Sequence, residues 1–301
     1  MTIQEFKNKA LAILKEKSPS PSLDIEVLLS YILGYTKTQI LLNRNQEIPE
    51  NKIEWLNQAV NKRSQGLPVA YITGHKEFYG YDFYVRPAVL IPKPDTEILV
   101  ERAIEIIIEK MDNRPNSILT VCDMCCGSAC IGLSVIKNLI EEYNIPEEKL
   151  PKFTFVDISL PALEIALKNA EKLNLPSERL RFIQSNLFDL IPWDFDIILT
   201  NPPYIPAKMV DELLMDNRNE PRLALDGDVK LNGEPSDSDD GLEIIRNLIP
   251  QAKEHLCPYG NILMESGEYN ALKAAKIAEN LAFKTKIHKD LEGQPRLIEI
   301  W

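Results

Sequence analysis

The sequence predicts an α/β protein in which a small helical domain precedes a mostly parallel, doubly wound sheet. Two observations lead to this prediction. From residue 117 onward, short β-rich runs alternate with amphipathic helical segments, as in sheets whose parallel strands are joined by crossover helices. Residues 1–75 show helical periodicity only. A chain of 301 residues, 45% of them hydrophobic, is long enough for two unequal domains.

Three segments at the start of the chain have the spacing and end signals of helices. "IQEFKNKALAIL" (3–14) places apolar residues three and four apart. "SPSLDIEVLLSYILG" (20–34) and "PENKIEWLNQAVNKRSQG" (49–66) open on proline-containing start signals and end on glycine. None of these segments carries a cluster of reactive side chains. Residues 1–74 are therefore expected to form a helical domain for packing or partner recognition.

A β-hairpin linker is expected at residues 75–92, because "GHKEFYGYDFYV" alternates apolar and polar residues around a glycine. The segment "IPKPDTEILVERAIEIIIEKM" then opens a helix after two prolines, with Asp95 or Thr96 as the expected N-cap. Residues 93–301 are predicted to form the larger domain.

Seven β-rich runs are expected to build the sheet of that domain. They are "SILTVCD" (117–123), "KFTFVD" (152–157), "LRFIQSN" (180–186), "FDIILTN" (195–201), "NILMES" (261–266), "KTKIHK" (284–289) and "RLIEIW" (296–301). Ligands of parallel α/β sheets bind at the carboxyl ends of the strands. Polar residues at these ends are therefore the first candidates for a site: Asp123, Asp157, Asn186 and Asn201.

The turn after the first strand keeps only Gly127 and Gly132 of a dinucleotide-binding G-x-G-x-x-G pattern, so the signal for NAD is weak. Gly127, Ser128 and Ala129 still form a narrow stretch over which a ligand can approach the backbone, although glycine also marks merely compact turns. Asp157 follows 30 residues after Gly127 and can accept both hydroxyls of a ribose. A helix cap or a solvated acid is the other interpretation of Asp157. Asn186 can contact an adenine edge or serve as an ordinary turn residue.

Charge and hydropathy narrow the class of protein. The net charge of -11 argues against a nucleic-acid-binding protein and leaves a basic protein partner open. No apolar run approaches the roughly 20 residues of a membrane span. The first 17 residues mix acids and bases and lack the core of a signal peptide, so the expected compartment is the cytosol.

Four of the five cysteines lie in "VCDMCCGSAC", at positions 122, 125, 126 and 130. Cys122 and Cys125 form one C-x2-C pair, but there is no second pair and the three histidines are scattered. Small core side chains are therefore favoured over a metal site, and no metal is expected.

The fourth strand runs directly into Asn-Pro-Pro-Tyr, in "DFDIILTNPPYIP" (194–206). The prolines end the strand and stiffen an extended elbow, because neither has a backbone N–H to donate. A rigid turn is one interpretation. The other is a pocket in which the Asn201 side chain and the Pro202 carbonyl accept the two hydrogens of a planar –NH2 group, with Tyr204 packed against it. Beside a nucleotide-like pocket, such an elbow indicates methyl transfer from S-adenosylmethionine.

The chain resembles the release-factor glutamine methyltransferases almost from end to end. The segments that carry the resemblance are "GLPVAYITGHKEFYGYDFYV", "VLIPKPDTEILVE", "VDISLPALEIALKNA", "TNPPYIP" and "NEPRLALDG". The tetrapeptide is shared with nucleic-acid amino-methyltransferases, whereas "YITG…EFYG" and "PDTE" are more specific to the glutamine enzymes.

The resemblance implies a Rossmann-like methyltransferase sheet of seven strands whose last pair is antiparallel, with residues 93–301 as the catalytic domain. It implies that S-adenosylmethionine, which becomes S-adenosylhomocysteine, lies on residues 125–129 (Cys125, Cys126, Gly127, Ser128 and Ala129) and on Asp157, with Leu187 near the adenine and Asn201 at the methyl group. The strand-end residues Asp123 and Asn186 are also expected to bind this cofactor. Asn201, Pro202, Pro203 and Tyr204 would hold the substrate amide, with Asn201, Pro202 and Tyr204 as catalytic residues. The substrate implied is the glutamine of a Gly-Gly-Gln loop in a peptide chain release factor, recognised with help from the helical domain.

The sequence departs from the family pattern at several positions. Cys125 and Ala129 stand where glycines are expected, which costs about 1 kcal/mol or more wherever φ is positive. Asn186 stands for a usual acid and Lys93 for a usual arginine. The loop "DVKLNGEPSDSDD" (228–240) is longer and more acidic than its family counterpart and is expected to be mobile and exposed.

The sequence therefore predicts a monomeric cytosolic enzyme that methylates a release-factor glutamine. The alternatives are a glutamine methyltransferase acting on a ribosomal protein, a DNA or RNA amino-methyltransferase, and a non-catalytic partner-binding relative with a degenerate cofactor turn.

Overall fold

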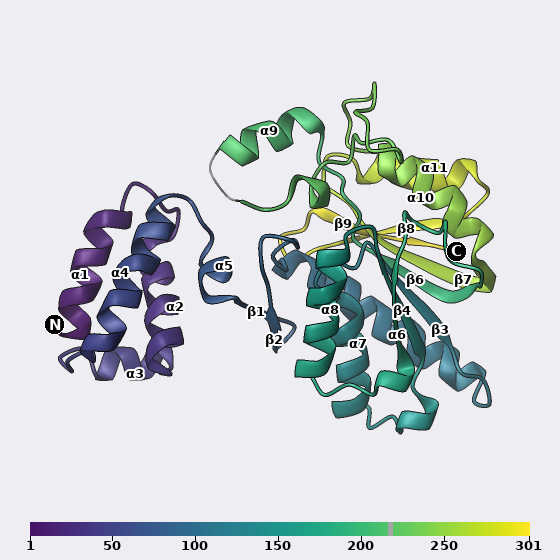
Figure 1. Ribbon diagram of the computed structural model, residues 1–301. Coiled ribbons are helices and arrows are strands. Elements are labelled where there is room, and N and C mark those ends of the chain that lie inside the picture. Colours follow the sequence, from purple (N-terminus) through teal and green to yellow (C-terminus); the bar gives the residue numbers. More distant parts are fainter. Residues whose placement is uncertain (216–218) are drawn as a thin grey trace. The chain divides into compact units, whose positions relative to one another are not determined.

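The computed structural model describes residues 1–215 and 219–301 (Figure 1). The chain divides into two compact units, Met1–His75 with Glu212–Asn219 and Lys76–Asp211 with Glu220–Trp301. The predicted limits of 1–74, 75–92 and 93–301 stay predictions of where the functional domains divide. Within the described residues, no helix combines the length and the apolar character that crossing a membrane requires.

The smaller unit is built from helices, as predicted. They are α1 (Ile3–Leu14), α2 (Pro21–Leu33), α3 (Lys37–Leu42), α4 (Glu50–Ser64) and α5 (Val69–Thr73). Phe6, Leu28 and Leu56 come from three of these helices and are at most 1% exposed in one shared core. The short helices α3 and α5 were not among the predicted segments, because six and five residues are too few to establish a helical period.

The expected hairpin is present as β1 (His75–Phe78) and β2 (Tyr81–Tyr84). Tyr79 and Gly80 connect the strands with φ of 52° and 76°, the backbone of a two-residue hairpin turn with both central residues at positive φ. Phe78 and Phe83 pack edge to face at 6.1 Å and lie in the core of the larger unit. The hairpin is thus part of that unit's packing rather than a free linker.

Seven strands of the described chain form one sheet with the order β5-β4-β3-β6-β7-β9-β8. Their bounds are β3 (Thr120–Met124), β4 (Lys152–Asp157), β5 (Leu180–Gln184), β6 (Phe195–Thr200), β7 (Leu256–Glu265), β8 (Thr285–Lys289) and β9 (Pro295–Ile300). The first five strands are parallel, and β9 runs antiparallel to both β7 and β8. The predicted doubly wound sheet, with its antiparallel last pair, is confirmed.

Helices cover both faces of this sheet (Figure 1). The helices α6 (Glu97–Asn113), α7 (Cys130–Glu141) and α8 (Leu160–Lys172) pack on one face, and α10 (Glu243–Glu254) and α11 (Ala271–Asn280) on the other. Alternate strand residues feed the two cores: Val121 belongs to the first core and Cys122 to the second. The helix α9 (Ala207–Met215) follows β6. The described residues also contain the 3-10 turns η1 (Pro94–Thr96), η2 (Glu147–Lys149), η3 (Ser177–Arg179) and η4 (Arg222–Ala224).

Thr96 occupies the N-cap position of α6, as expected, but its hydroxyl makes no capping hydrogen bond. Asp95, the other candidate, pairs with Arg296 at 3.4 Å. Thr96 is 2% exposed and faces polar side chains at the end of the sheet. A buried hydroxyl that contacts other polar side chains does not need a hydrogen bond to the backbone of its own helix.

The strand order reverses between β3 and β6, which is where ligands bind in open α/β sheets. Met124 at the end of β3 is paired with Thr200 at the end of β6. The next residues of the two strands, Cys125 and Asn201, are therefore brought side by side at the carboxyl edge.

Candidate active site

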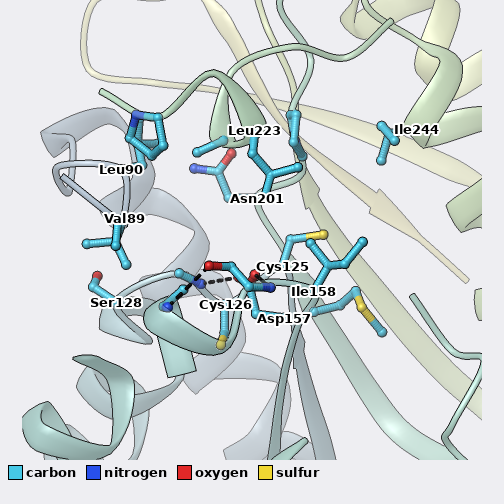
Figure 2. Close-up of a pocket in the computed structure, with 18 of the residues that line it drawn as sticks. Val89, Leu90, Cys125, Cys126, Ser128, Asp157, Ile158, Asn201, Leu223 and Ile244 are labelled. Carbon is cyan, nitrogen blue, oxygen red and sulfur yellow. Dashed lines mark hydrogen bonds between the residues drawn. The ribbon is translucent and has the colours of Figure 1, made fainter. Parts of the chain in front are cut away.

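A cavity of about 380 Å³ opens at this switch point, within the range of 300–1,000 Å³ usual for small-molecule sites. In Figure 2, Asn201 and Leu223 lie on one side of the cavity, and Cys126 and Asp157 on the other. Among the predicted site residues, the following line it: Cys125, Cys126, Gly127, Ser128, Asp157, Asn186, Leu187, Asn201 and Pro203.

The turn after β3 adopts a left-handed backbone at alternate residues. The φ angles of Cys125, Gly127 and Ala129 are 59°, 54° and 60°. Cys125 and Ala129, which stand where glycines were expected, therefore do adopt positive φ. This conformation costs about 1–2 kcal/mol for each residue that has a Cβ. Such strain is typical of ligand-binding turns. At Gly127, a Cβ would meet no atom within 4 Å, so the space above this residue is open to a ligand.

Behind the turn, Asp123 is fully buried and accepts the N–H of Gly132 at 2.9 Å. A Cβ on Gly132 would lie 2.6 Å from the Phe155 ring, so only glycine fits there. Burial raises the pKa of Asp123 to about 8, the charge of Asp157 adds to the rise, and the Gly132 hydrogen bond opposes it. Asp123 and Ala129 support the turn without lining the cavity.

Asp157, the last residue of β4, has one carboxylate oxygen within 2.8 Å of the Gly127 N–H and the other within 2.9 Å of the Ser159 N–H (dashed in Figure 2). The hydroxyl of Ser159 caps α8 by accepting the N–H of Ala162. Asp157 is thus free of the capping task that was its alternative interpretation. Burial raises the pKa of Asp157, and the N–H groups of Ser159, Gly127 and Ile158 oppose that rise.

The thiols of this region are held as neutral groups. Burial, followed by the charges of Asp157 and Asp123, raises the pKa of Cys125, which lines the cavity. Burial also raises the pKa of Cys130 to about 12. Across residues 1–215 and 219–301, no three potential metal-ligating side chains converge.

The elbow after β6 is clamped by surrounding backbone and side chains. The Tyr204 carbonyl accepts hydrogen bonds from Asn270 Nδ2 at 2.9 Å and from the Tyr269 hydroxyl at 3.4 Å. A Cβ on Gly241 would lie 2.1 Å from the same carbonyl oxygen, so the crossing chain must be glycine there. The elbow therefore has little freedom to move.

The side chains of the elbow point in different directions. Asn201 and Pro203 face the cavity, and Asn201 Nδ2 donates to Thr96 Oγ1 at 3.4 Å. Pro202 is buried, and the Tyr204 hydroxyl donates to Glu265 Oε1 at 3.1 Å. Pro202 and Tyr204 do not line the cavity, so their side chains shape the elbow from behind.

The acidic loop 228–240 contributes to the cavity. Its tip at Asn232–Pro235 is exposed, as expected, but Asp228 is only 2% exposed, and Val229, Lys230 and Leu231 line the cavity wall. The expectation of a wholly exposed loop is therefore wrong. Asn186 Nδ2 donates a hydrogen bond to the Leu231 carbonyl at 3.0 Å. The family pattern has an acid at this position, and an ionised carboxylate has no hydrogen to donate.

Several lining residues were not singled out from the sequence. The apolar walls include Val89, Leu90 and Leu223, whose irregular segments give no periodic signal, and Ile244 from the first turn of α10. Ile158 carried a usable signal in its position directly after the strand-end acid Asp157, and in the structure it lines the cavity and is 45% exposed. Lys93, noted as a departure, pairs through one nitrogen with Glu220 at 2.7 Å, as expected of an ammonium group.

Family comparisons cover most of the chain. Residues 5–74 match the PrmC N-terminal domain, and residues 98–219 match the methyltransferase small domain. A release factor glutamine methyltransferase from Clostridium acetobutylicum is 34% identical, covering 99% of this chain and 98% of its own length. One from Rhodopirellula baltica is 36% identical, covering 95% and 91%. Among solved structures, a methyltransferase from Pyrococcus furiosus is 17% identical with a TM-score of 0.48, covering 84% of this chain and 98% of its own.

Proposed function

The chain belongs to the release factor glutamine methyltransferase family, and on that premise we propose that it methylates the side-chain amide nitrogen of a glutamine in a peptide chain release factor. The target is the glutamine of the Gly-Gly-Gln loop, and the methyl donor is S-adenosylmethionine. The observation that carries this proposal is the pairing of Met124 with Thr200, which sets the strained turn and the Asn201 elbow at one cavity.

The side chains and the open backbone that line the cavity fit S-adenosylmethionine. Asp157 would accept the ribose hydroxyls, since a carboxylate at the end of the second strand has this task in nucleotide-binding sheets. The open space over Gly127 fits a ligand that approaches the backbone. Leu187, 6% exposed, and Ile158 offer apolar surface for an adenine ring, with Asn186 at its edge. When bound, the cofactor supplies an electrophilic methyl group on a positively charged sulfur.

The elbow would hold the substrate amide. Asn201 Oδ1 and the Pro202 carbonyl accept the two amide hydrogens, and the fixed elbow aims the nitrogen at the methyl group. Pro203 lines the approach, and the Tyr204 ring, anchored through its hydroxyl, supports the elbow from behind. An amide nitrogen is a poor nucleophile, so orientation is the main contribution, and well-oriented reactants gain up to several kcal/mol.

The test is mass spectrometry of a purified release factor after incubation with the protein and S-adenosylmethionine. We expect one added methyl on the loop glutamine. With Asn201→Ala, we expect the rate to fall by at least about 100-fold, because the nitrogen loses its orientation. Equal activity of that variant would remove the elbow from the mechanism.

Other outcomes separate the alternatives. Cofactor binding without methylation of the release factor would point to a ribosomal-protein glutamine, or, with steeply salt-dependent oligonucleotide binding, to a nucleic-acid substrate. Partner binding without any cofactor binding would support a non-catalytic relative. We further propose that the enzyme acts in the cytosol as a monomer, which light scattering of the purified protein checks.

A further inference from the structure

A group of buried polar side chains extends from Asn201 at the cavity wall into the interior. Asn201 Nδ2 donates to Thr96 Oγ1 at 3.4 Å, and the Tyr204 hydroxyl donates to Glu265 Oε1 at 3.1 Å. Thr96 and Glu265 are both 2% exposed, and of the two only Thr96 lines the cavity. These four residues come from the start of α6, the elbow and the end of β7, and the proposed reaction uses only two of them directly.

Glu265 acts in this group as an acceptor of hydrogen bonds. Burial raises its pKa, whereas the neighbouring Thr96 hydroxyl, the Tyr204 hydroxyl and the charge of Arg296 oppose that rise. Its second oxygen, Oε2, is buried and has no hydrogen-bond partner within the described part of the chain. When Glu265 is ionised, its carboxylate only accepts hydrogen bonds, and an unsatisfied oxygen in the interior is costly. The Thr96 hydroxyl is the neighbouring donor that can direct its hydrogen at Oε2.

The direction of the Thr96 hydroxyl decides the orientation of the Asn201 amide. A threonine hydroxyl has one hydrogen and two lone pairs. With the hydrogen directed at Glu265, only lone pairs remain for Asn201, so Asn201 must present Nδ2 to Thr96. The carbonyl oxygen Oδ1 then points the other way, toward the cavity. The flipped amide would present two hydrogens to the substrate and repel its –NH2 group.

We propose that Thr96 and Glu265 are positioning residues that hold the Asn201 amide with its carbonyl oxygen toward the substrate nitrogen. Glu265 also anchors Tyr204, so one buried carboxylate fixes both ends of the Asn-Pro-Pro-Tyr elbow. The separation of 3.4 Å between Asn201 and Thr96 is long for a hydrogen bond, and such contacts often tighten when substrate binds. This inference rests on the proposed function.

The first test compares Thr96→Val with Thr96→Ser in the full-length protein. Valine keeps the shape and removes the hydroxyl, whereas serine keeps the hydroxyl. We expect Thr96→Val to lower kcat by about 10- to 100-fold, as misplacement of a reacting group does, with the cofactor Kd unchanged by calorimetry. We expect Thr96→Ser to restore most of kcat. If Thr96 only stabilised the fold, each variant would lower Tm according to the packing that it loses, and Thr96→Ser would not restore kcat.

Glu265→Gln is the second variant and decides the outcome if Thr96→Val fails to fold. Glutamine has the same shape but presents an –NH2 group, which reverses the hydrogen-bond direction at one of the two hydroxyls. We expect a loss of kcat similar to that of Thr96→Val, with an unchanged cofactor Kd. Wild-type kcat in both variants would overturn the inference.

Asn201→Ala distinguishes failure of this inference from failure of the proposed function. If Asn201→Ala is inactive while Thr96→Val and Glu265→Gln are fully active, Asn201 acts without the positioning residues and only the inference fails. If Asn201→Ala itself keeps full activity, the elbow mechanism fails and the positioning role fails with it.

Discussion

The turn after β3 and the elbow after β6 meet at the centre of the sheet, but they are held in different ways. The turn depends on backbone conformation, with Cys125, Gly127 and Ala129 all at positive φ. The elbow depends on proline rings and on hydrogen bonds to Tyr204 from Asn270 and Tyr269. The backbone strain of the turn is local, and the turn tolerates a Cβ at Cys125 and at Ala129. The elbow is held by segments distant in the sequence, so we expect it to tolerate fewer substitutions.

The largest expected difference between the two regions concerns cofactor affinity. We expect Asp157→Ala to raise the cofactor Kd by about 10- to 100-fold, because a hydrogen bond to a charged group contributes about 1.5–3 kcal/mol. Asn201→Ala is the matched control from the elbow and should keep the wild-type Kd. Calorimetry with S-adenosylhomocysteine measures both. An unchanged Kd in Asp157→Ala would refute its ribose role.

A second difference concerns pH. The pKa of Asp123 is about 8 in the folded protein against an ordinary value of 3.8, so the folded state binds the proton more tightly. Its contribution is complete below about pH 4 and is lost as pH rises toward about 8, at no more than about 1.4 kcal/mol per pH unit. We expect Asp123→Asn to flatten this decline, as measured by urea unfolding at pH 5, 6.5 and 8. Parallel declines in the variant and the wild type would assign the pH dependence elsewhere, for example to Glu265, whose pKa is also raised by burial.

A smaller effect, on the rate of cofactor dissociation, is expected at Asn186, which bonds to the acidic loop 228–240. Asn186→Asp keeps the size of the side chain and removes the hydrogen bond to the Leu231 carbonyl. Loss of a net contribution of about 1 kcal/mol should speed cofactor dissociation by roughly 5-fold. Because Asp can still accept from an adenine amino group, slower dissociation would instead favour the adenine role of this residue. Stopped-flow dissociation distinguishes the two.

The smallest effects are expected within the turn itself. Ala129→Gly relieves a left-handed alanine but adds chain entropy to the unfolded state, so we expect a change in unfolding free energy below about 1 kcal/mol. Gly127→Ala is the opposite change at φ of 54° and should destabilise by about 1 kcal/mol. Thermal unfolding of both variants tests whether backbone conformation holds the turn. Destabilisation by Ala129→Gly as large as that by Gly127→Ala would argue that packing holds it instead.

Periodicity and strand-end residues were enough to predict the sheet, and β4 (Lys152–Asp157) and α1 (Ile3–Leu14) have the predicted bounds. The strand-end rule also brought Asp157 and Asn201 to one cavity. Positions supplied by irregular segments escaped prediction. Leu231 lines the cavity in a loop that Asn186 holds through a hydrogen bond, and no sequence pattern links these two residues. The Thr96 hydroxyl was assigned to a helix cap because its buried neighbour, Glu265, lies 169 residues further along the sequence.

Cys125 gives the cavity a second methyl acceptor besides the substrate. A thiolate is a far stronger nucleophile than an amide nitrogen, and it would lie beside the sulfonium group of the proposed donor. Burial and the two neighbouring carboxylates raise the pKa of this thiol, so the sulfur keeps its proton. On the proposed function, the protonated sulfur would be a poor methyl acceptor, and the enzyme would be spared self-alkylation. Protonation would then set the chemoselectivity between the two acceptors, and the carboxylates beside the turn would protect the enzyme from its own reagent.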